Sequence, residues 1–238
     1  MSELDRVRLF LSVEHVCGYL PGRASRNAFI DPDFPLNPVR YGWLLDQGFR
    51  RSGAHVYRPY CQQCNSCLPA RIPVRHFQPG RTQRRCLARN ADLELTIVDR
   101  LEDEHYALYR DYLQARHPGG GMDAHNREAF HTFLECPWGE VRYWEFRLQG
   151  RLLALAVVDE TPRGLSAVYT FFDPTETRRS LGTLAVLRQI EICREYGLDH
   201  VYLGYWVPGS EKMDYKRHFR PMELLMHGGW KTLPVDVR

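Results

Sequence analysis

The chain has 238 residues, of which 44% are hydrophobic and 26% are charged, and its 32 basic and 29 acidic residues leave a net charge of +3. Such proportions are typical of a soluble globular protein, and they exclude a collagen-like chain, a wholly disordered chain and a small disulfide-bonded scaffold. The longest apolar run, residues 152–158, is too short for a membrane span, which requires about 20 apolar residues.

The N-terminal segment mixes acids and bases from residue 3 onward, and it lacks the apolar core of an export signal. Seven cysteines, an odd number, also argue against a framework of structural disulfides. We therefore expect a cytoplasmic protein with reduced thiols and no membrane partner.

Regular structure is predicted mainly downstream of residue 90, whereas residues 1–75 are rich in Pro, Gly and Arg and have few periodic segments. We expect a small N-terminal domain at 1–75 and a catalytic domain at 76–238. Apolar alternation predicts strands and helical spacing predicts helices in this order: a strand at 93–98, helices at 101–116 and 123–134, strands at 141–147, 151–158 and 165–172, a helix at 180–196 capped by Ser180, a strand at 200–206, a short helix capped by Ser210, and a strand at 224–226.

The passage from the strand at 165–172 through a helix to the strand at 200–206 predicts that these two strands run parallel in a mixed sheet. The order of elements is that of the GCN5-type N-acetyltransferase fold. We therefore predict an α+β protein, with a small Cys-containing N-terminal domain before an acetyltransferase-like mixed sheet flanked by helices. A fold alone says little about the substrate, so the function must be argued from particular residues.

Basic residues are concentrated in one segment. The 45 residues between Asp46 and Asp92 contain no carboxylate and nine arginines, which leaves 23 bases against 29 acids in the remainder, a net charge of −6. A local positive field of this kind attracts polyanions and favours contact with a nucleic acid. A solvated, arginine-rich surface is the alternative interpretation.

Three cysteines at C-x2-C-x2-C spacing, Cys61, Cys64 and Cys67, can turn inward onto one metal ion or iron–sulfur cluster. Cys17 is the best candidate for a fourth ligand, since it also lies in the irregular N-terminal part. The spacing does not distinguish zinc from an iron–sulfur cluster, and three free thiols in a tight turn remain the alternative.

The C-terminal run 202–221 combines aromatic and basic residues. Gly204 lies within a predicted strand, where glycine is costly unless the strand bulges or another group approaches closely. The side chains of Lys212, Lys216 and Arg220 follow i, i+4 spacing, so they form one basic stripe or, alternatively, a solvated helix face. Aromatic faces that could stack on a base are also present in this run: Tyr202, Tyr205, Trp206 and Tyr215.

Residues 177–183 connect a strand to a helix and contain Arg178 and Arg179. Backbone N–H groups at such a helix start, flanked by arginines, can bind an anion. In acetyltransferases this place usually holds the pyrophosphate of coenzyme A in a glycine-rich turn. Only Gly182 is available here, which weakens the coenzyme interpretation, whereas a tRNA 3′ end would present phosphates to the same place.

Across nearly its whole length the sequence resembles the aminoacyl-tRNA–protein transferases of the arginyltransferase type, and it is most similar to their bacterial branch, the aspartate/glutamate leucyltransferases. Leu20 stands where the eukaryotic arginyltransferases have a second cysteine, which favours the leucyl branch. The matching stretches are 17–21 (CGYLP), 57–74 (YRPYCQQCNSCLPARIPV), 83–85 (QRR), 167–171 (AVYTF), 178–182 (RRSLG), 202–205 (YLGY) and 212–216 (KMDYK).

The resemblance implies that leucine moves from leucyl-tRNA to the α-amine of proteins with N-terminal Asp or Glu, which marks them for degradation. The chemistry requires no cofactor, although a structural zinc or iron–sulfur cluster could be bound. The roles that we expect on this basis are as follows: proton donation by Tyr215, orientation of the amine by Asp214, recognition of the N-terminal acid by Arg75, Lys216 and Arg58, contact with tRNA phosphates by Arg81, Arg84, Arg85 and Arg178, and a leucyl pocket bordered by Tyr169 and Tyr205.

Three other functions remain open at this point. The donor could be arginyl-tRNA instead of leucyl-tRNA. The protein could be a coenzyme A-dependent N-acetyltransferase, or a noncatalytic metal-ribbon module that binds nucleic acid. The last would explain the cysteines and arginines, but it leaves the C-terminal sheet without a purpose.

Overall fold

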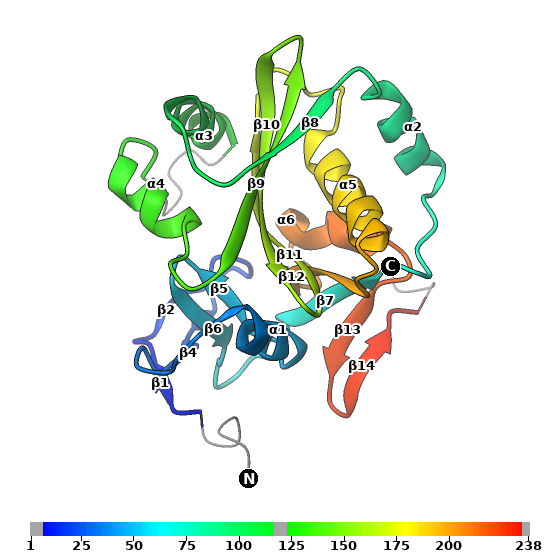
Figure 1. Cartoon of the computed structure of the whole chain (residues 1–238). Coiled ribbons are helices and arrows are strands. Elements are labelled where there is room, and N and C mark those ends of the chain that lie inside the picture. The colour runs from blue at the N-terminus through cyan, green and yellow to red at the C-terminus, as the bar shows by residue number, and fades with distance from the viewer. Residues whose placement is uncertain (1–6, 117–122, 235–238) are drawn as a thin grey trace.

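The computed structural model describes residues 7–116 and 123–234; residues 1–6, on which the expected absence of an export signal partly rests, lie outside the described residues. A mixed sheet of eight strands runs through the centre (Figure 1), with the strand order β14-β13-β7-β12-β11-β10-β9-β8. Its strands are β7 (Leu68–Pro73), β8 (Glu94–Val98), β9 (Glu140–Leu148), β10 (Arg151–Thr161), β11 (Gly164–Phe172), β12 (His200–Trp206), β13 (Glu223–Met226) and β14 (Gly229–Thr232).

Helices cover both faces of this sheet, and they explain why β10 is an almost unbroken apolar run (Figure 1). One core lies between the sheet and the helices α2 and α5, and the other lies between the sheet and the helices α3 and α4. The helix bounds are α2 (Arg81–Arg89), α3 (Asp103–Arg116), α4 (Arg127–Leu134), α5 (Leu181–Glu195) and α6 (Glu211–Asp214), which a 3-10 turn at Tyr215–His218 continues.

The strands β11 and β12 are parallel, as predicted, but they remain paired over only three residues. Gly164, Leu165 and Ser166 pair with His200, Val201 and Tyr202, and the two strands diverge beyond this point. β12 stays paired to β7 on its other side through a register shift at Gly204, whose φ of +73° suits glycine. The sheet therefore has a gap between the C-terminal halves of β11 and β12.

The N-terminal region forms a smaller four-stranded sheet in the order β1-β4-β6-β5, packed against α1 (Pro38–Asp46). Its strands are β1 (Leu9–Leu11), β4 (Asn27–Ile30), β5 (Arg50–Ser52) and β6 (His55–Pro59), and β2 (His15–Val16) pairs with β3 (Ala24–Ser25) beside it. β7 follows directly and lies between β12 and β13 in the large sheet. The expected boundary at residue 75 thus falls after a strand that belongs to the large sheet.

The predicted α+β class and the mixed sheet flanked by helices are confirmed, as are all strands and helices predicted between residues 93 and 226. The predicted cap positions are confirmed, because Ser180 and Ser210 are the N-cap residues of α5 and α6, but neither side chain makes a capping hydrogen bond. Ser180 instead adopts a left-handed conformation with φ of +55°. The prediction missed the strands before residue 75, the helices α1 and α2, and β14.

Candidate active site

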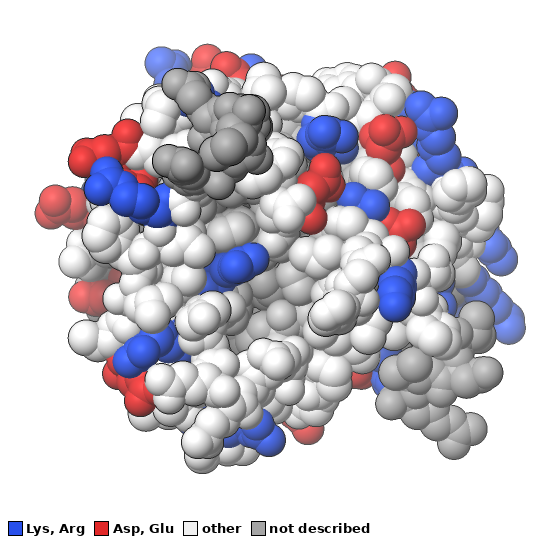
Figure 2. All heavy atoms as spheres, turned by 90° about the horizontal axis from the view of Figure 1, so that it is seen from below, with Lys and Arg blue, Asp and Glu red and all other residues white. Residues whose placement is uncertain are grey.

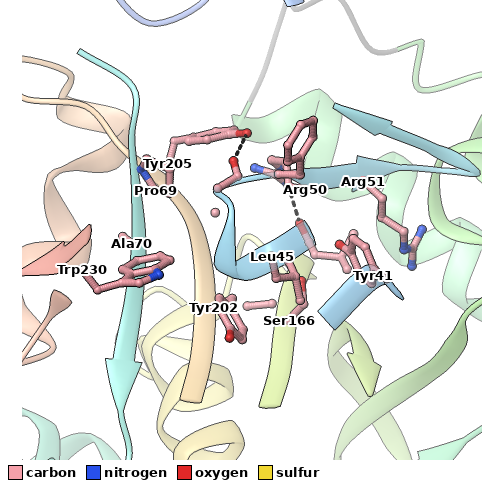
Figure 3. Close-up of a pocket in the computed structure, with 15 residues that line it drawn as sticks. Tyr41, Leu45, Arg50, Arg51, Pro69, Ala70, Ser166, Tyr202, Tyr205 and Trp230 are labelled. Carbon is pink, nitrogen blue, oxygen red and sulfur yellow. Dashed lines mark hydrogen bonds between the residues drawn. The ribbon is translucent and has the colours of Figure 1, made fainter. Parts of the chain in front are cut away.

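A narrow pocket lies beside the gap between β11 and β12, where the N-terminal region packs against the large sheet (Figure 3). Two tyrosines of β12 line this pocket, and their hydroxyls form hydrogen bonds with the N-terminal region. The Tyr205 hydroxyl donates to the Gly48 and Tyr57 carbonyls at 2.9 and 3.3 Å, and the Tyr202 hydroxyl donates to Asp46 at 2.6 Å. These hydrogen bonds join β12 to the end of α1, to the segment that connects α1 to β5, and to β6.

Arg50, the first residue of β5, extends towards Tyr205 and the gap (Figure 3). Its Nη2 donates to the Val168 carbonyl on β11 at 3.2 Å, and its guanidinium carbon lies 6.0 Å from the centre of the Tyr205 ring. A Cβ atom on Gly204 would lie 2.8 Å from Arg50 Nη1, so the glycine makes room for the guanidinium. No carboxylate among the described residues forms an ion pair with Arg50, although the arginine is always charged.

Arg51, the next residue, turns away from the pocket and is fully paired (Figure 3). Its guanidinium donates to both Asp159 oxygens and to the carbonyls of Gly53, Leu134 and Glu135, and it is 1% exposed. Arg51 thus joins β5 to β10 and to the end of α4, which is a structural role.

Lys216, predicted to read the N-terminal acid, lies in the same neighbourhood as Arg50. It is 4% exposed, and its Nζ donates to the Tyr205 carbonyl at 2.6 Å. Burial, and then repulsion by Arg50, lower the pKa of Lys216 to about 7. Lys212 is exposed and Arg220 donates to the Pro234 carbonyl, so the expected basic stripe is not formed.

Tyr215, the predicted proton donor, lies beside Lys216, whose Nζ is 5.8 Å from the centre of the tyrosine ring. The residue keeps 46% of its surface exposed, yet burial raises the pKa of its hydroxyl to about 12, and Arg50 acts in the opposite direction. The hydroxyl is therefore protonated at neutral pH. The neighbouring Asp214 pairs with Arg217 on its own turn at 3.0 Å.

Tyr169 and Tyr205 were both expected to border a leucyl pocket, but the structure separates their surroundings. Tyr169 lies on the half of β11 that pairs with β10 but no longer with β12, in a group of aromatic rings that includes Tyr112 of α3 and Phe133 of α4. Its buried hydroxyl has no hydrogen-bond partner in the described part of the chain. This apolar group suits a leucyl side chain, whereas the Tyr205 ring faces Arg50.

Two of the residues that were predicted to recognise the N-terminal acid, Arg75 and Arg58, do not line the pocket. Arg75 follows the end of β7 that pairs with His200, which is the end opposite the gap; it is 69% exposed and pairs with Asp199 at 3.3 Å. Its place in the fold removes it from the pocket. Arg58 on β6 stacks 4.9 Å above the ring of Phe49, which lines the pocket, so it lies behind that wall.

The predicted tRNA contacts Arg81, Arg84 and Arg85 lie on α2, and all three are exposed. Arg178 is also exposed. It lies beside this helix, since its carbonyl accepts a hydrogen bond from Arg89 of α2. The structure therefore brings the four residues to one side of the molecule. On the face drawn in Figure 2, by contrast, basic side chains are scattered around a central hollow among acidic and uncharged ones.

The four cysteines predicted as metal ligands lie near one another. Burial raises the pKa of Cys67 to about 12, with further contributions from Cys61, Cys17 and Cys64. The Cys61 thiol contacts Ser25, however, and the Cys64 thiol contacts Ser66. In the described ranges, the group of three ligand side chains that lie within 4.8 Å of one another contains no cysteine: Glu104, His105 and Glu145. A metal at the cysteines stays a prediction, and no chemical step is assigned to it.

The prediction missed Arg50, although it belongs to the arginine-rich segment that was singled out. In the sequence nothing distinguishes it from Arg51, because the two are adjacent and identical. Tyr19 was missed as well, although it lies in the motif at 17–21; burial raises its pKa, and Arg50 acts on it in the opposite direction.

The chain matches two protein-family models. Residues 15–85 match the N terminus of arginine-tRNA-protein transferase, and residues 104–226 match its C terminus. Curated proteins from Pseudomonas putida and Pseudomonas entomophila, both named aspartate/glutamate leucyltransferase, are 48% identical over 98% of this chain and 100% of their own length.

A solved structure with a related fold is a C-terminal domain of the DUF2156 type from Agrobacterium fabrum. It aligns with a TM-score of 0.51 and 16% identity over 79% of this chain, which spans 61% of the length of that one. At this identity the match concerns the fold alone.

Proposed function

The chain belongs to the arginine-tRNA-protein transferase family, and on this premise we propose that it transfers leucine from leucyl-tRNA to the α-amine of proteins that begin with Asp or Glu. The observation that carries the proposal is the 48% identity, over 98% of the chain, to relatives named for this activity. The structure supports it with two cations beside a gap in the sheet, the half-buried Arg50 and the buried Lys216.

The reaction is a simple acyl transfer. The α-amine nitrogen attacks the carbonyl carbon of the leucyl ester, the bond from this carbon to the ribose oxygen breaks, and the proton lost by the amine ends on the ribose oxygen. The ester is already activated, so no ATP is consumed. The protein must mainly hold amine and ester together and stabilise the oxyanion.

Two side chains at the gap suit the proton transfers. Lys216, with a pKa lowered to about 7, exists in both protonation states near neutral pH and can take a proton from the α-amine. The Tyr215 hydroxyl is protonated and can give its proton to the ribose oxygen. Asp214 can orient the amine only if it leaves Arg217.

The leucyl-tRNA donor must place its charged 3′ end near the gap between β11 and β12. We assign the phosphates of the tRNA acceptor end to the exposed arginines of α2 and to Arg178, which precedes α5. The leucyl side chain would enter the aromatic group around Tyr169.

The biological setting follows from the reaction that we propose. A protein that receives leucine on an acidic N-terminus is marked for degradation, and this role belongs to the cytoplasm, where charged tRNA and its protein substrates meet. In the described part of the chain, no helix is long and apolar enough to cross a membrane.

The test is to incubate the protein with leucyl-tRNA and a peptide that begins with Asp, and then to weigh the peptide. The addition of one leucine is expected. Transfer from arginyl-tRNA alone would reassign the donor, and an acetyl group added from acetyl coenzyme A would make the protein an acetyltransferase. Binding of tRNA without any product would refute an enzymatic function.

A further inference from the structure

We propose that Arg50 is the residue that selects the acidic N-terminus, by binding the side-chain carboxylate of the first Asp or Glu of the acceptor. This inference rests on the proposed function and adds a specificity residue to it. It replaces Arg75, which the fold holds at the opposite end of β7.

The position of Arg50 supports this role. Its guanidinium spans the gap in the sheet, since it contacts the Val168 carbonyl on β11 and lies against Gly204 on β12. That carbonyl is its one hydrogen-bond acceptor among the described residues, whereas a guanidinium has five N–H donors. Donors therefore remain for a planar, two-oxygen acceptor such as a carboxylate.

The charges around Arg50 support it as well. Two other arginines of the segment, the buried Arg51 and the half-buried Arg71, have carboxylate partners: Arg51 pairs with Asp159, and Arg71 pairs with Asp46 and Glu223. Arg50 is surrounded by tyrosines and the second cation Lys216. A charge that is partly withdrawn from water and has no counterion is costly, and a ligand that supplies the carboxylate reduces this cost.

This arrangement also explains how amides would be rejected. Asn and Gln have nearly the shape of Asp and Glu but no charge, so they would leave the half-buried guanidinium without a counterion. Sites that depend on such a pairing can discriminate by several orders of magnitude. Asp and Glu differ by one methylene, which the flexible arginine can accommodate.

The experiment compares Arg50→Gln with the wild type on peptides that differ only in the first residue, Asp or Asn, with leucyl-tRNA as donor. We expect kcat/KM for the Asp peptide to fall about 100-fold and the Asp-to-Asn ratio to approach one, while the affinity for leucyl-tRNA is unchanged. The matched control is Arg142→Gln on β9, whose guanidinium pairs with Glu140 and Glu160 away from the gap.

An Asp-to-Asn ratio that stays at the wild-type value in Arg50→Gln overturns the proposal, as does an equal loss of tRNA affinity. If Arg50→Gln does not fold, Arg50→Lys decides, because it keeps the charge and loses the planar two-donor geometry. The ratio should then fall about tenfold, and an unchanged ratio again overturns the proposal.

The failure of the proposed function would be visible separately, since the wild type itself would then transfer no leucine. In that case calorimetry without tRNA still tests Arg50. The Asp peptide should bind the wild type more tightly than the Asn peptide does, and Arg50→Gln should abolish the difference. Equal binding of both peptides by the wild type would refute the role of Arg50.

Discussion

Two parts of the acid-free segment, β5 and α2, have the same kind of composition and opposite surroundings. On β5, both arginines point into the protein, where Arg51 is fully paired and Arg50 faces the gap. On α2, arginines cover the solvent side of the helix, and only Gln83 and Cys86 are buried. A concentration of charge in the sequence therefore does not by itself define one binding surface.

The difference follows from local structure. Successive side chains of a strand point to opposite faces, so Arg50 and Arg51 meet different surroundings, with Arg51 buried and Arg50 half-buried, whereas a helix at the surface buries only one stripe. Under the proposed function, β5 would contribute stability and selectivity, and α2 would contribute long-range attraction of a polyanion. The following predictions test this division.

The largest effect on stability is expected for the buried ion pair between Arg51 of β5 and Asp159 of β10. Asp159→Asn would leave the buried Arg51 guanidinium without its counterion, so the free energy of unfolding should fall by about 3–5 kcal/mol. Denaturant unfolding measures this, with Asp111→Asn as the control, because Asp111 forms an exposed ion pair with Arg110. A loss no larger than that of the control would contradict the structural role of Arg51.

The next effect concerns Lys216 and pH. The folded protein holds its pKa near 7, well below the value of the unfolded chain, so above pH 7 the unfolded state binds more protons and stability rises with pH. Between pH 7 and 9 the wild type should gain up to about 1.4 kcal/mol per pH unit relative to Lys216→Met. Thermal unfolding at both pH values measures the difference, and parallel curves for the two proteins would refute the lowered pKa.

A smaller effect is expected at α2. The double variant Arg81→Gln and Arg85→Gln should bind leucyl-tRNA several-fold more weakly, and the slope of log affinity against log salt should decrease by about one to two. Stability should hardly change, since exposed substitutions usually cost less than about 0.5 kcal/mol. A variant that loses stability but keeps its salt dependence would remove the distinction between α2 and β5.

The smallest effect is expected at Arg75. Arg75→Ala removes an exposed ion pair, which is worth about 0–1 kcal/mol, and it should leave the Asp-to-Asn preference intact. Peptide assays with both first residues measure this. A lost preference would restore the role that the sequence suggested for Arg75.

The elements that could be predicted are those with a clear period. The alternation in β9 and the helical spacing in α5 locate them within a few residues, and the parallel pair of β11 and β12 follows from the helix between them. β7 could not be predicted in the same way. It contains Pro69 and Pro73, which argue against a central strand, yet it lies between β12 and β13.

The candidate site was predicted only in part. Tyr215 and Lys216 of the motif at 212–216 lie near the gap, because the motif follows the strand that forms one side of it, and their chemical roles stay predictions. The roles of Arg50 and Arg51 depend on partners far away in the sequence, Val168 and Asp159. Only the folded chain shows which of two adjacent arginines is left without a carboxylate.

The position of β7 has a consequence for the chain as it leaves the ribosome. Ile72 pairs with Val201, and Ala70 pairs with Leu224, so this strand finds its neighbours only when synthesis is almost complete. Until then both of its edges are open, and open edges invite pairing with other nascent chains. Yield in the cell should therefore depend on how long the N-terminal part is shielded before the last strands arrive.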